Sequence, residues 1–311
     1  MAGSESLHGG IDAPVLVYDR IGANKRQTWL MMLIFVGLAG GFATIIAMAL
    51  ELPWQAAPFV IAVLAAYALF SYYASASIAL AVSSAHPVTK EEEPELYRIV
   101  ENLCIGSGLP MPKVYLIEDG APNAFATGRD PQHASVTATR GLLNKLDKSE
   151  LEGVIAHEMS HIGNYDIRIM TITVVLVGLV ALLADFFMRW TWFGSGGRRS
   201  NNDRGGNLQL ILFALAILLA ILAPIAARLI QLAISRTREY GADETGARMT
   251  GNPHGLASAL EKLHAASRAH PLPNANPATA HLFIVNPLSA GGIANLFSTH
   301  PPMEERVRRL R

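Results

Sequence analysis

The sequence predicts a mainly α-helical integral membrane protein with four transmembrane helices and a water-soluble domain that contains a small β-sheet. Of its 311 residues, 51% are hydrophobic and only 16% are charged, whereas roughly 25% are charged in an average soluble domain. The apolar residues are concentrated in four long runs with few or no charges. A polar segment of ordinary globular character separates the second run from the third.

The composition excludes three other classes of protein. A disordered chain would be rich in charge and poor in apolar residues. A nucleic-acid-binding protein would carry a basic surplus, but the 25 Lys and Arg residues balance the 25 Asp and Glu residues. A secreted domain held by disulfides needs paired cysteines, and Cys104 is the only cysteine in the sequence.

The four apolar runs are long enough to cross a membrane. A helix over the first run would be about 33 Å long, and a bilayer's hydrocarbon core is about 30 Å thick. Four such runs in one chain favour membrane segments over the alternative, buried core helices. The runs cover 28–50, 57–82, 171–187 and 208–234.

The charges around the runs predict an orientation. Lys25 and Arg26 precede the first run, and the short loop 51–55 has no Lys or Arg. The positive-inside rule therefore places the N-terminus and the soluble domain in the cytoplasm. Arginines flank the last two runs on both sides, so charge alone decides poorly there. The predicted parts are a cytoplasmic segment 1–27, transmembrane helices 1 and 2 in 28–82, a first soluble part 83–170, a transmembrane hairpin 171–234 and a second soluble part 235–311.

The soluble parts carry helix and strand signals. Apolar spacing predicts a helix over 92–105 that ends at Gly106. Ser149 and Glu152 form a capping box that predicts another helix start nearby. The other expected elements are strands at 113–118, 123–127 and 134–139, a helical stretch at 241–270, and a last helix that opens at Pro301.

The helix that starts near Ser149 contains the motif H-E-x-x-H at 157–161. His157 and His161 are four residues apart, so both imidazoles lie on one helical face and can bind one metal ion. Glu158 lies between them, placed to accept a proton from a metal-bound water. Imidazole ligands suit zinc, and a catalytic zinc site keeps a water in its fourth position. The alternative is an ordinary helix with two histidines.

A catalytic site of this kind needs a third ligand. The residues after Gly163 lack the third His of a metzincin. Glu239 and Asp243 are again four residues apart, so Glu239 could bind the metal and Asp243 could hold the far nitrogen of a ligand His. The alternative is a solvated helix face. If 171–234 forms a hairpin, both ligand helices emerge on one side of the membrane, roughly 10–15 Å from its surface.

These motifs resemble the HtpX family of membrane-embedded heat-shock zinc metalloproteases, gluzincins related to the CAAX prenyl protease. The resemblance covers nearly the whole chain. It implies four transmembrane helices and a zincin-like metalloprotease domain in two parts, 83–170 and 235–311. The matching stretches are NAFATG at 123–128, HEMSH at 157–161, SRTREYGAD at 235–243, and the region from HLFI at 281–284 to FSTHPP at 297–302.

The resemblance also implies a role for each matching position. It makes His157, His161 and Glu239 the zinc ligands, Glu158 the general base and Asp243 the orienting carboxylate. An edge strand that would pair with extended substrate by β-augmentation contains Asn123, Ala124, Phe125 and Ala126. His300 and Arg306 match positions near the active site that could stabilise an oxyanion. The alternative for Arg306 is one more base in a cationic tail.

The expected function is a zinc endopeptidase with one Zn²⁺ per chain, which cuts misfolded or damaged membrane proteins on the cytoplasmic side of the bacterial inner membrane. The expected partners are polypeptide substrates and the lipid bilayer, and no nucleic acid. Two alternatives remain. A CAAX-type processing protease would need a chamber, which four spans are too few to wall. A non-catalytic zinc-stabilised scaffold would have no use for Glu158 as a base.

Overall fold

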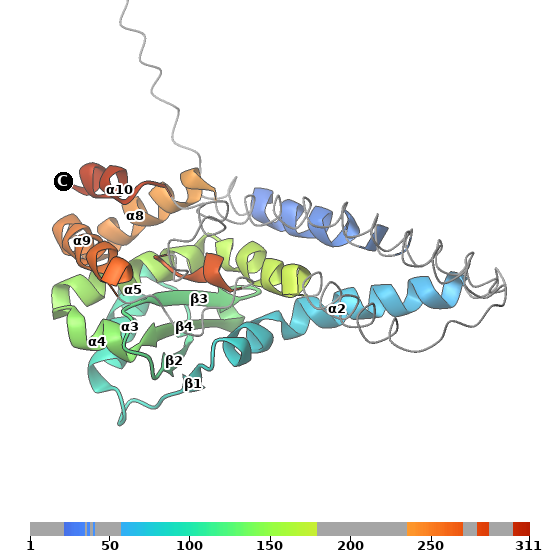
Figure 1. The fold of residues 1–311 in the computed structure, drawn as a ribbon, viewed down its shortest axis with the longest axis horizontal. Helices are drawn as coiled ribbons and strands as arrows, with labels where there is room; N and C mark the ends of the chain where they lie inside the picture. The colour runs from blue at the N-terminus through green and yellow to red at the C-terminus, as the bar shows by residue number, and fades with distance from the viewer. Residues whose placement is uncertain are drawn as a thin grey trace, which may run out of the picture.

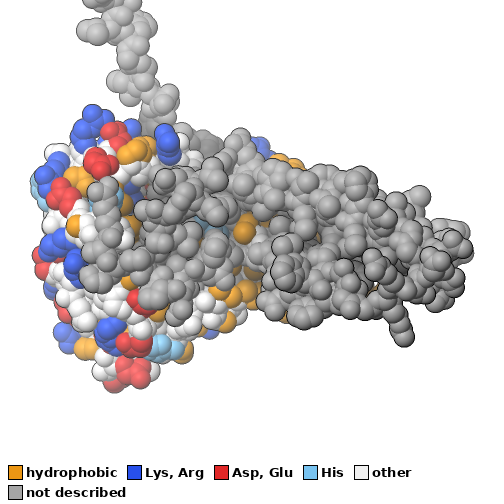
Figure 2. All heavy atoms as spheres, in the orientation of Figure 1, with side chains coloured by type: hydrophobic (Ala, Val, Ile, Leu, Met, Phe, Trp, Pro, Cys, Tyr) orange, Lys and Arg blue, Asp and Glu red, His pale blue; other side chains and the backbone are white. Residues whose placement is uncertain are grey.

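The computed structural model describes residues 22–34, 36–37, 40, 57–178, 235–269, 279–285 and 301–311. Helices and a small sheet form a domain at one end of the molecule, and long helical segments extend from it (Figure 1). Charged side chains of both signs cover the domain at the end away from the extended segments (Figure 2).

Among the described residues, one helix is long and apolar enough to cross a membrane, with its most apolar part at Ala65–Val82. This helix, α2 (Ala57–Val82), coincides with the second predicted span. The first predicted span is described in part, and residues 22–34 are helical. Of the third, residues 171–178 are described and helical, whereas the fourth, 208–234, lies outside the described residues. The number of four spans therefore stays a prediction.

The domain contains one four-stranded mixed sheet with the order β1-β2-β4-β3. The central strands β2 and β4 are parallel, and the other neighbours are antiparallel. The expected pairing of 123–127 with 134–139 is confirmed, because Ala124 faces Ala138 and Gly128 faces Ala134. The strands are β1 (His86–Pro87), β2 (Lys113–Ile117), β3 (Ala124–Gly128) and β4 (Ala134–Thr139).

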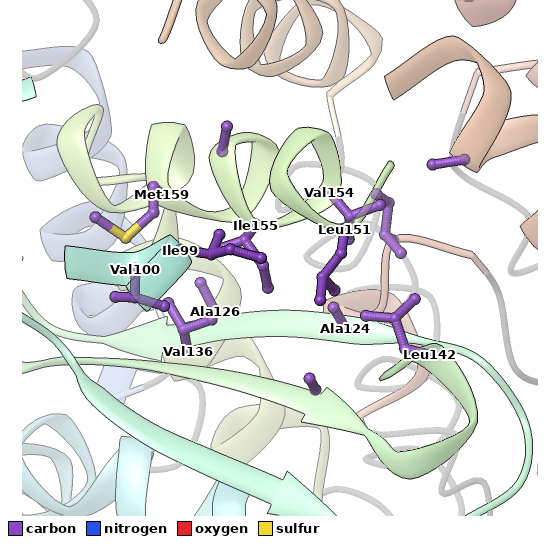
Figure 3. Close-up of a cluster of buried hydrophobic side chains, with 14 of the residues drawn as sticks. Ile99, Val100, Ala124, Ala126, Val136, Leu142, Leu151, Val154, Ile155 and Met159 are labelled. Carbon is purple, nitrogen blue, oxygen red and sulfur yellow. The ribbon is translucent and has the colours of Figure 1, made fainter. Parts of the chain in front are cut away.

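The central helix of the domain is α5 (Lys148–Gly163), which lies between the sheet and the C-terminal helices (Figure 1). Val154, Ile155 and Met159 on α5 point toward the sheet and pack over Ala126 and other small strand residues (Figure 3). Small side chains on the strands let the helix approach closely. The buried face of α5 therefore fixes where the H-E-x-x-H motif stands.

The start of α5 differs from the prediction. The capping box is formed by Asp147 and Glu150, each side chain accepting a 3.0 Å hydrogen bond from the other's backbone N–H. The predicted capping box of Ser149 and Glu152 is wrong. The Ser149 hydroxyl instead accepts a hydrogen bond from the side-chain amide of Asn252.

Two other helices also have different ends than expected. The helix α3 (Pro94–Ser107) runs past Gly106 and stops at Gly108, which adopts the left-handed conformation at φ 71°. The expected stretch 241–270 is two helices, α8 (Arg236–Thr250) and α9 (Pro253–Ala269), because Gly251 has φ 63° and Pro253 opens a new helix. The remaining helices are α4 (Arg140–Lys145) and α10 (Met303–Leu310), which begins two residues after Pro301.

Glycines allow the helices around α5 to pack closely. A Cβ on Gly246 of α8 would lie 2.9 Å from the backbone nitrogen of His157 and 3.1 Å from its Cα. A Cβ on Gly153 of α5 would lie 2.7 Å from the backbone nitrogen of Leu256 on α9. Contacts this short leave no room for a methyl group, so α8 and α9 touch the backbone of α5 directly.

We expect Gly246→Ala to destabilise the protein, because the new methyl group must push α8 away from His157. Overpacking of this kind costs roughly 1–3 kcal/mol, which would appear as a lower unfolding temperature in detergent. Gly106→Ala is the matched control. No atom lies within 4 Å of its new Cβ, and the lost glycine entropy favours the helix. An unchanged unfolding temperature for Gly246→Ala would show that α8 does not pack on α5 as described.

Candidate metal centre

Two helices bring three ligand side chains together. His157 and His161 lie on α5, and Glu239 lies on the first turn of α8. Their candidate ligand atoms all lie within 4.8 Å of one another, and all three side chains are buried. The Nε2 atoms of the two histidines are 3.2 Å apart, and the Glu239 oxygens lie 3.9 Å from His157 Nε2 and 3.7 Å from His161 Nε2.

The hydrogen bonds of both imidazoles favour a bound cation. His157 Nδ1 lies 2.9 Å from Asp243 Oδ1, and His161 Nδ1 lies 3.0 Å from Asp166 Oδ2. A proton shared with a carboxylate at Nδ1 leaves Nε2 as an unprotonated acceptor. Two such lone pairs and a carboxylate then face one another inside the protein, and a metal ion satisfies all three. Two His and one Glu with a position left for water are a catalytic zinc donor set.

The pKa values of the two histidines are shifted in opposite directions. Burial lowers the pKa of His157 and outweighs the hydrogen bond that this ring donates to Asp243, so the ring is neutral and can be a ligand. Burial also opposes the charged form of His161, but the hydrogen bond that this ring donates to Asp166 and the charge of Glu239 raise its pKa to about 9. The negative field that holds a proton on His161 would equally attract a divalent cation, which competes with that proton.

Asp166 is a functional residue that the sequence analysis missed. It follows the end of α5, where Tyr165 adopts a left-handed conformation at φ 60° and interrupts the helix before a second helical stretch begins. This turn carries the Asp166 carboxylate back to His161. A carboxylate five residues after a ligand would not face it in a continuous helix, so spacing gave no signal. The residues Gly163 and Asn164, which are typical of a helix end, were the available sign that the helix breaks before Asp166.

Asp243 is held on its other side by Arg306. Arg306 is fully buried, and its Nε and Nη2 donate to the two Asp243 oxygens at 2.8 and 2.7 Å. Burial raises the pKa of Asp243, but the charge and hydrogen bonds of Arg306 outweigh it and bring that pKa to about 2. Asp243 therefore stays ionised and keeps His157 oriented. The third nitrogen, Nη1, lies 3.4 Å from the Ile284 carbonyl oxygen and 3.6 Å from Glu239 Oε2.

Glu158 lies beside the ligands and is itself buried. Burial raises the pKa of Glu158 to about 7, although the positive charge of His161 and the N–H of Ala126, which donates to the carboxylate, lower it. Its Oε2 atom has no hydrogen-bond partner among the described residues. A buried, unpaired carboxylate oxygen is costly for stability, and such a group is typical of a site where a proton is exchanged.

The predicted substrate strand is covered on its outer edge in the described conformation. Ile284 N–H donates to the Ala124 carbonyl at 3.0 Å, and the Asn123 amide donates to the Val285 carbonyl at 2.8 Å. The Phe125 ring contacts the Phe283 ring with centroids 4.8 Å apart. Residues 283–285 thus occupy the edge near Asn123 and Ala124, so an extended peptide could pair there only after this segment moves. Substrate binding by 123–126 stays a prediction.

The structure thus assembles most of the predicted site. It brings together His157, Glu158, His161, Glu239, Asp243 and Arg306. His300 lies outside the described residues.

Comparison with known proteins identifies the family. Residues 90–311 match the sequence model of peptidase family M48. A protease HtpX homolog of Tropheryma whipplei is 47% identical over 296 residues, which cover 95% of this chain and 98% of that protein. A protease HtpX homolog of Pyrococcus furiosus is 55% identical over 244 residues, 78% of this chain and 81% of that protein. The crystal structure of S. mikatae Ste24p aligns with 17% identity and a TM-score of 0.49, over 92% of this chain and 66% of that chain.

The family model and the HtpX homologs confirm the resemblance that the motifs indicated. The match at 47% identity runs over nearly the full length of both proteins, so it includes the predicted membrane segments as well as the protease domain. The chain therefore belongs to peptidase family M48, among the HtpX proteases.

Proposed function

We propose that this membrane-bound M48 metalloprotease holds one zinc ion at His157, His161 and Glu239. It cuts damaged or misassembled membrane proteins on the cytoplasmic side of the bacterial inner membrane. One observation carries the proposal. Three buried ligand atoms converge within 4.8 Å beside Glu158, whose buried Oε2 is unpaired among the described residues. A structural zinc site would be closed by a fourth ligand and would not need that carboxylate.

Each residue of the site has a distinct task in peptide hydrolysis. When bound, zinc supplies Lewis acidity that polarises the scissile carbonyl and acidifies the attacking water. Glu158 takes the proton of that water and passes it to the leaving amine, and a pKa near 7 suits both transfers. Asp243 and Asp166 bind the Nδ1 atoms of the two imidazoles and so hold both rings in a fixed orientation.

The proposed oxyanion donors are Arg306 and His300. Two of the three Arg306 nitrogens are bound to Asp243, so Nη1 is the atom that can turn toward developing charge. In the described conformation Nη1 points to the Ile284 carbonyl at 3.4 Å. A substrate carbonyl that replaces this contact would meet the same donor.

Exposed apolar side chains support lipid as the partner of the extended helices. On α2, Phe59 and Phe70 are 73% and 63% exposed, and in the helix at 22–34, Leu33 is 71% exposed. Exposed apolar surface on this scale marks a protein or membrane interface. Together with the positive-inside pattern, it supports a membrane position with the protease domain in the cytoplasm.

Aromatic and cationic side chains gather where these helices meet the domain. Lys25 Nζ lies 4.5 Å from the Tyr165 ring centre, and the Arg168 guanidinium lies 5.6 Å from the Tyr72 ring centre. The Arg129 guanidinium lies 5.3 Å from the centre of the neighbouring Tyr73 ring. Tyrosines with cations are typical of the headgroup level of a membrane protein, so we place the membrane surface at this junction.

We expect Glu158→Gln to abolish proteolysis while zinc stays bound at one ion per chain. Loss of a general base lowers the rate by roughly 10²–10⁴-fold, and the three ligands are unchanged. Cleavage of casein and metal content of the purified chain are the two measurements. The matched control is Glu152→Gln, the same change on the solvent side of α5, which should cut at the wild-type rate. Wild-type activity in Glu158→Gln would exclude it as the base.

Removal of zinc should stop cleavage reversibly. We expect the chain purified in detergent with a chelator to be inactive on casein or a membrane protein, and to regain activity when zinc is returned. Self-cleavage should follow the same pattern, because zinc supplies the Lewis acid for every substrate. A chain that binds zinc but cuts no substrate would instead support the non-catalytic scaffold.

The cytoplasmic position of the domain predicts a labelling pattern in whole cells. In a Cys104→Ala background, Lys145→Cys on the domain surface should react with a membrane-impermeant maleimide only after the inner membrane is opened. Gln55→Cys, in the loop between the first two predicted spans, should react in cells whose inner membrane is intact. Labelling of Lys145→Cys before that step would place the active site on the opposite side.

A further inference from the structure

We propose that Asn24 is a positioning residue of the metal site, which joins the first helix of the chain to both helices that carry the ligands. This inference rests on the proposed zinc protease function and adds a residue to it. Asn24 lies in the helical stretch 22–34, next to the first predicted membrane span, and more than 130 residues before His161. No part of the H-E-x-x-H motif or its flanks contains it.

The side-chain amide of Asn24 is buried and makes three hydrogen bonds. Its exposed fraction is 5%. Nδ2 donates to Asp166 Oδ1 at 2.7 Å and to the Asn164 carbonyl at 3.0 Å. Oδ1 accepts from Arg238 Nη1 at 3.2 Å. An amide that donates twice and accepts once in a buried place satisfies a specific set of partners, and no other side-chain type has this arrangement of donors and acceptor at this size.

The first of these bonds reaches a metal ligand through one intermediate. The Asp166 carboxylate is buried, and its two oxygens have different partners: Oδ1 accepts from Asn24, and Oδ2 lies 3.0 Å from His161 Nδ1. With both oxygens bound, the carboxylate has one orientation. Without Asn24, it can rotate away from His161, and the imidazole loses the group that fixes its plane and its protonated nitrogen.

The hydrogen bond that Asn24 Oδ1 accepts reaches the other ligand helix. Arg238 directly precedes Glu239 on α8, and it is the partner of the Asn24 carbonyl oxygen. The Asn164 carbonyl, at the end of α5, is held by the same amide. One side chain therefore ties the end of α5 to the start of α8 at the level of the metal ligands.

The position of Asn24 depends in turn on the docking of its helix. Met31 and Met32 are buried against Ile169, Ile172 and other apolar residues of the stretch that follows α5. The Trp29 ring stacks on a tyrosine of α2 at 5.9 Å. Because these contacts fix the helix at 22–34, they also fix the amide of Asn24. The metal site is therefore complete only when the first membrane-proximal helix is in place.

The test is zinc affinity of the full chain in detergent, measured by competition with a chromophoric chelator. Asn24→Asp keeps the shape but replaces the donor to Asp166 by a second carboxylate. We expect a 10–100-fold loss of zinc affinity, the range for loss of a group that orients a ligand. The visible absorption of the cobalt-substituted chain should also change, because it reports ligand geometry. Gln27→Glu, the same chemical change three residues later, should leave both unchanged.

Two further variants make the result decisive. In an Asp166→Asn background, Asn24→Asp should lower the zinc affinity by less than a further threefold, because both changes act on one contact. Asn24→Ala removes the donor without adding charge, and should lose affinity in the same direction even where Asn24→Asp fails to fold. Wild-type affinity and an unchanged cobalt spectrum in Asn24→Ala, or fully multiplicative losses in the double variant, would overturn the inference. A wild-type chain that binds neither zinc nor cobalt would overturn the proposed function as well.

Discussion

Charge balance in a buried volume is the constraint on which the protease domain depends. Glu158, Asp166, Glu239 and Asp243 are all buried around two histidines. Among the described residues, the arginines Arg306 and Arg238 face them. Buried charges are tolerated only when they are paired or bind a metal. When both histidines are neutral ligands and Glu158 is ionised, four carboxylates against two arginines leave a negative surplus that a divalent cation matches. The helices, the close glycine contacts and the turn at Tyr165 all place these groups.

Local sequence signals predicted the parts of the site that lie on continuous helices. Spacing alone placed His157 and His161 on one face, and Glu239 and Asp243 on another, because i and i+4 side chains are neighbours in any helix. Asp166 and Asn24 could not be found this way. The first depends on a left-handed residue that interrupts the helix, and the second on the docking of a helix from the other end of the sequence. Contacts of this kind produce no regular spacing of residues in the sequence.

The helix boundaries show the same limit in smaller form. Gly106 and Gly108 are equally good as the glycine that ends α3, and Gly108 is the one that adopts the left-handed conformation and donates its N–H to the Cys104 carbonyl. Asp147 and Ser149 each precede a Glu by three residues, but the Ser149 hydroxyl is used by Asn252 of the α8–α9 turn. Arg306 was predicted from family resemblance as an oxyanion donor, and the structure adds a second contact, with Asp243, that no pattern indicated.

The tyrosine and cation contacts at the junction of helices and domain set a minimum length for the substrate. In the proposed placement, Lys25 on Tyr165 and Arg168 on Tyr72 lie at the level of the headgroups, which sets the height of the active site above the lipid. An extended chain gains about 3.3 Å per residue, and a site roughly 10–15 Å from the surface is reached by about three to five residues. A well-folded membrane protein with tight loops offers no such free length. A polypeptide with a frayed end or an unfolded loop does, so under the proposed function reach alone would separate damaged substrates from intact ones.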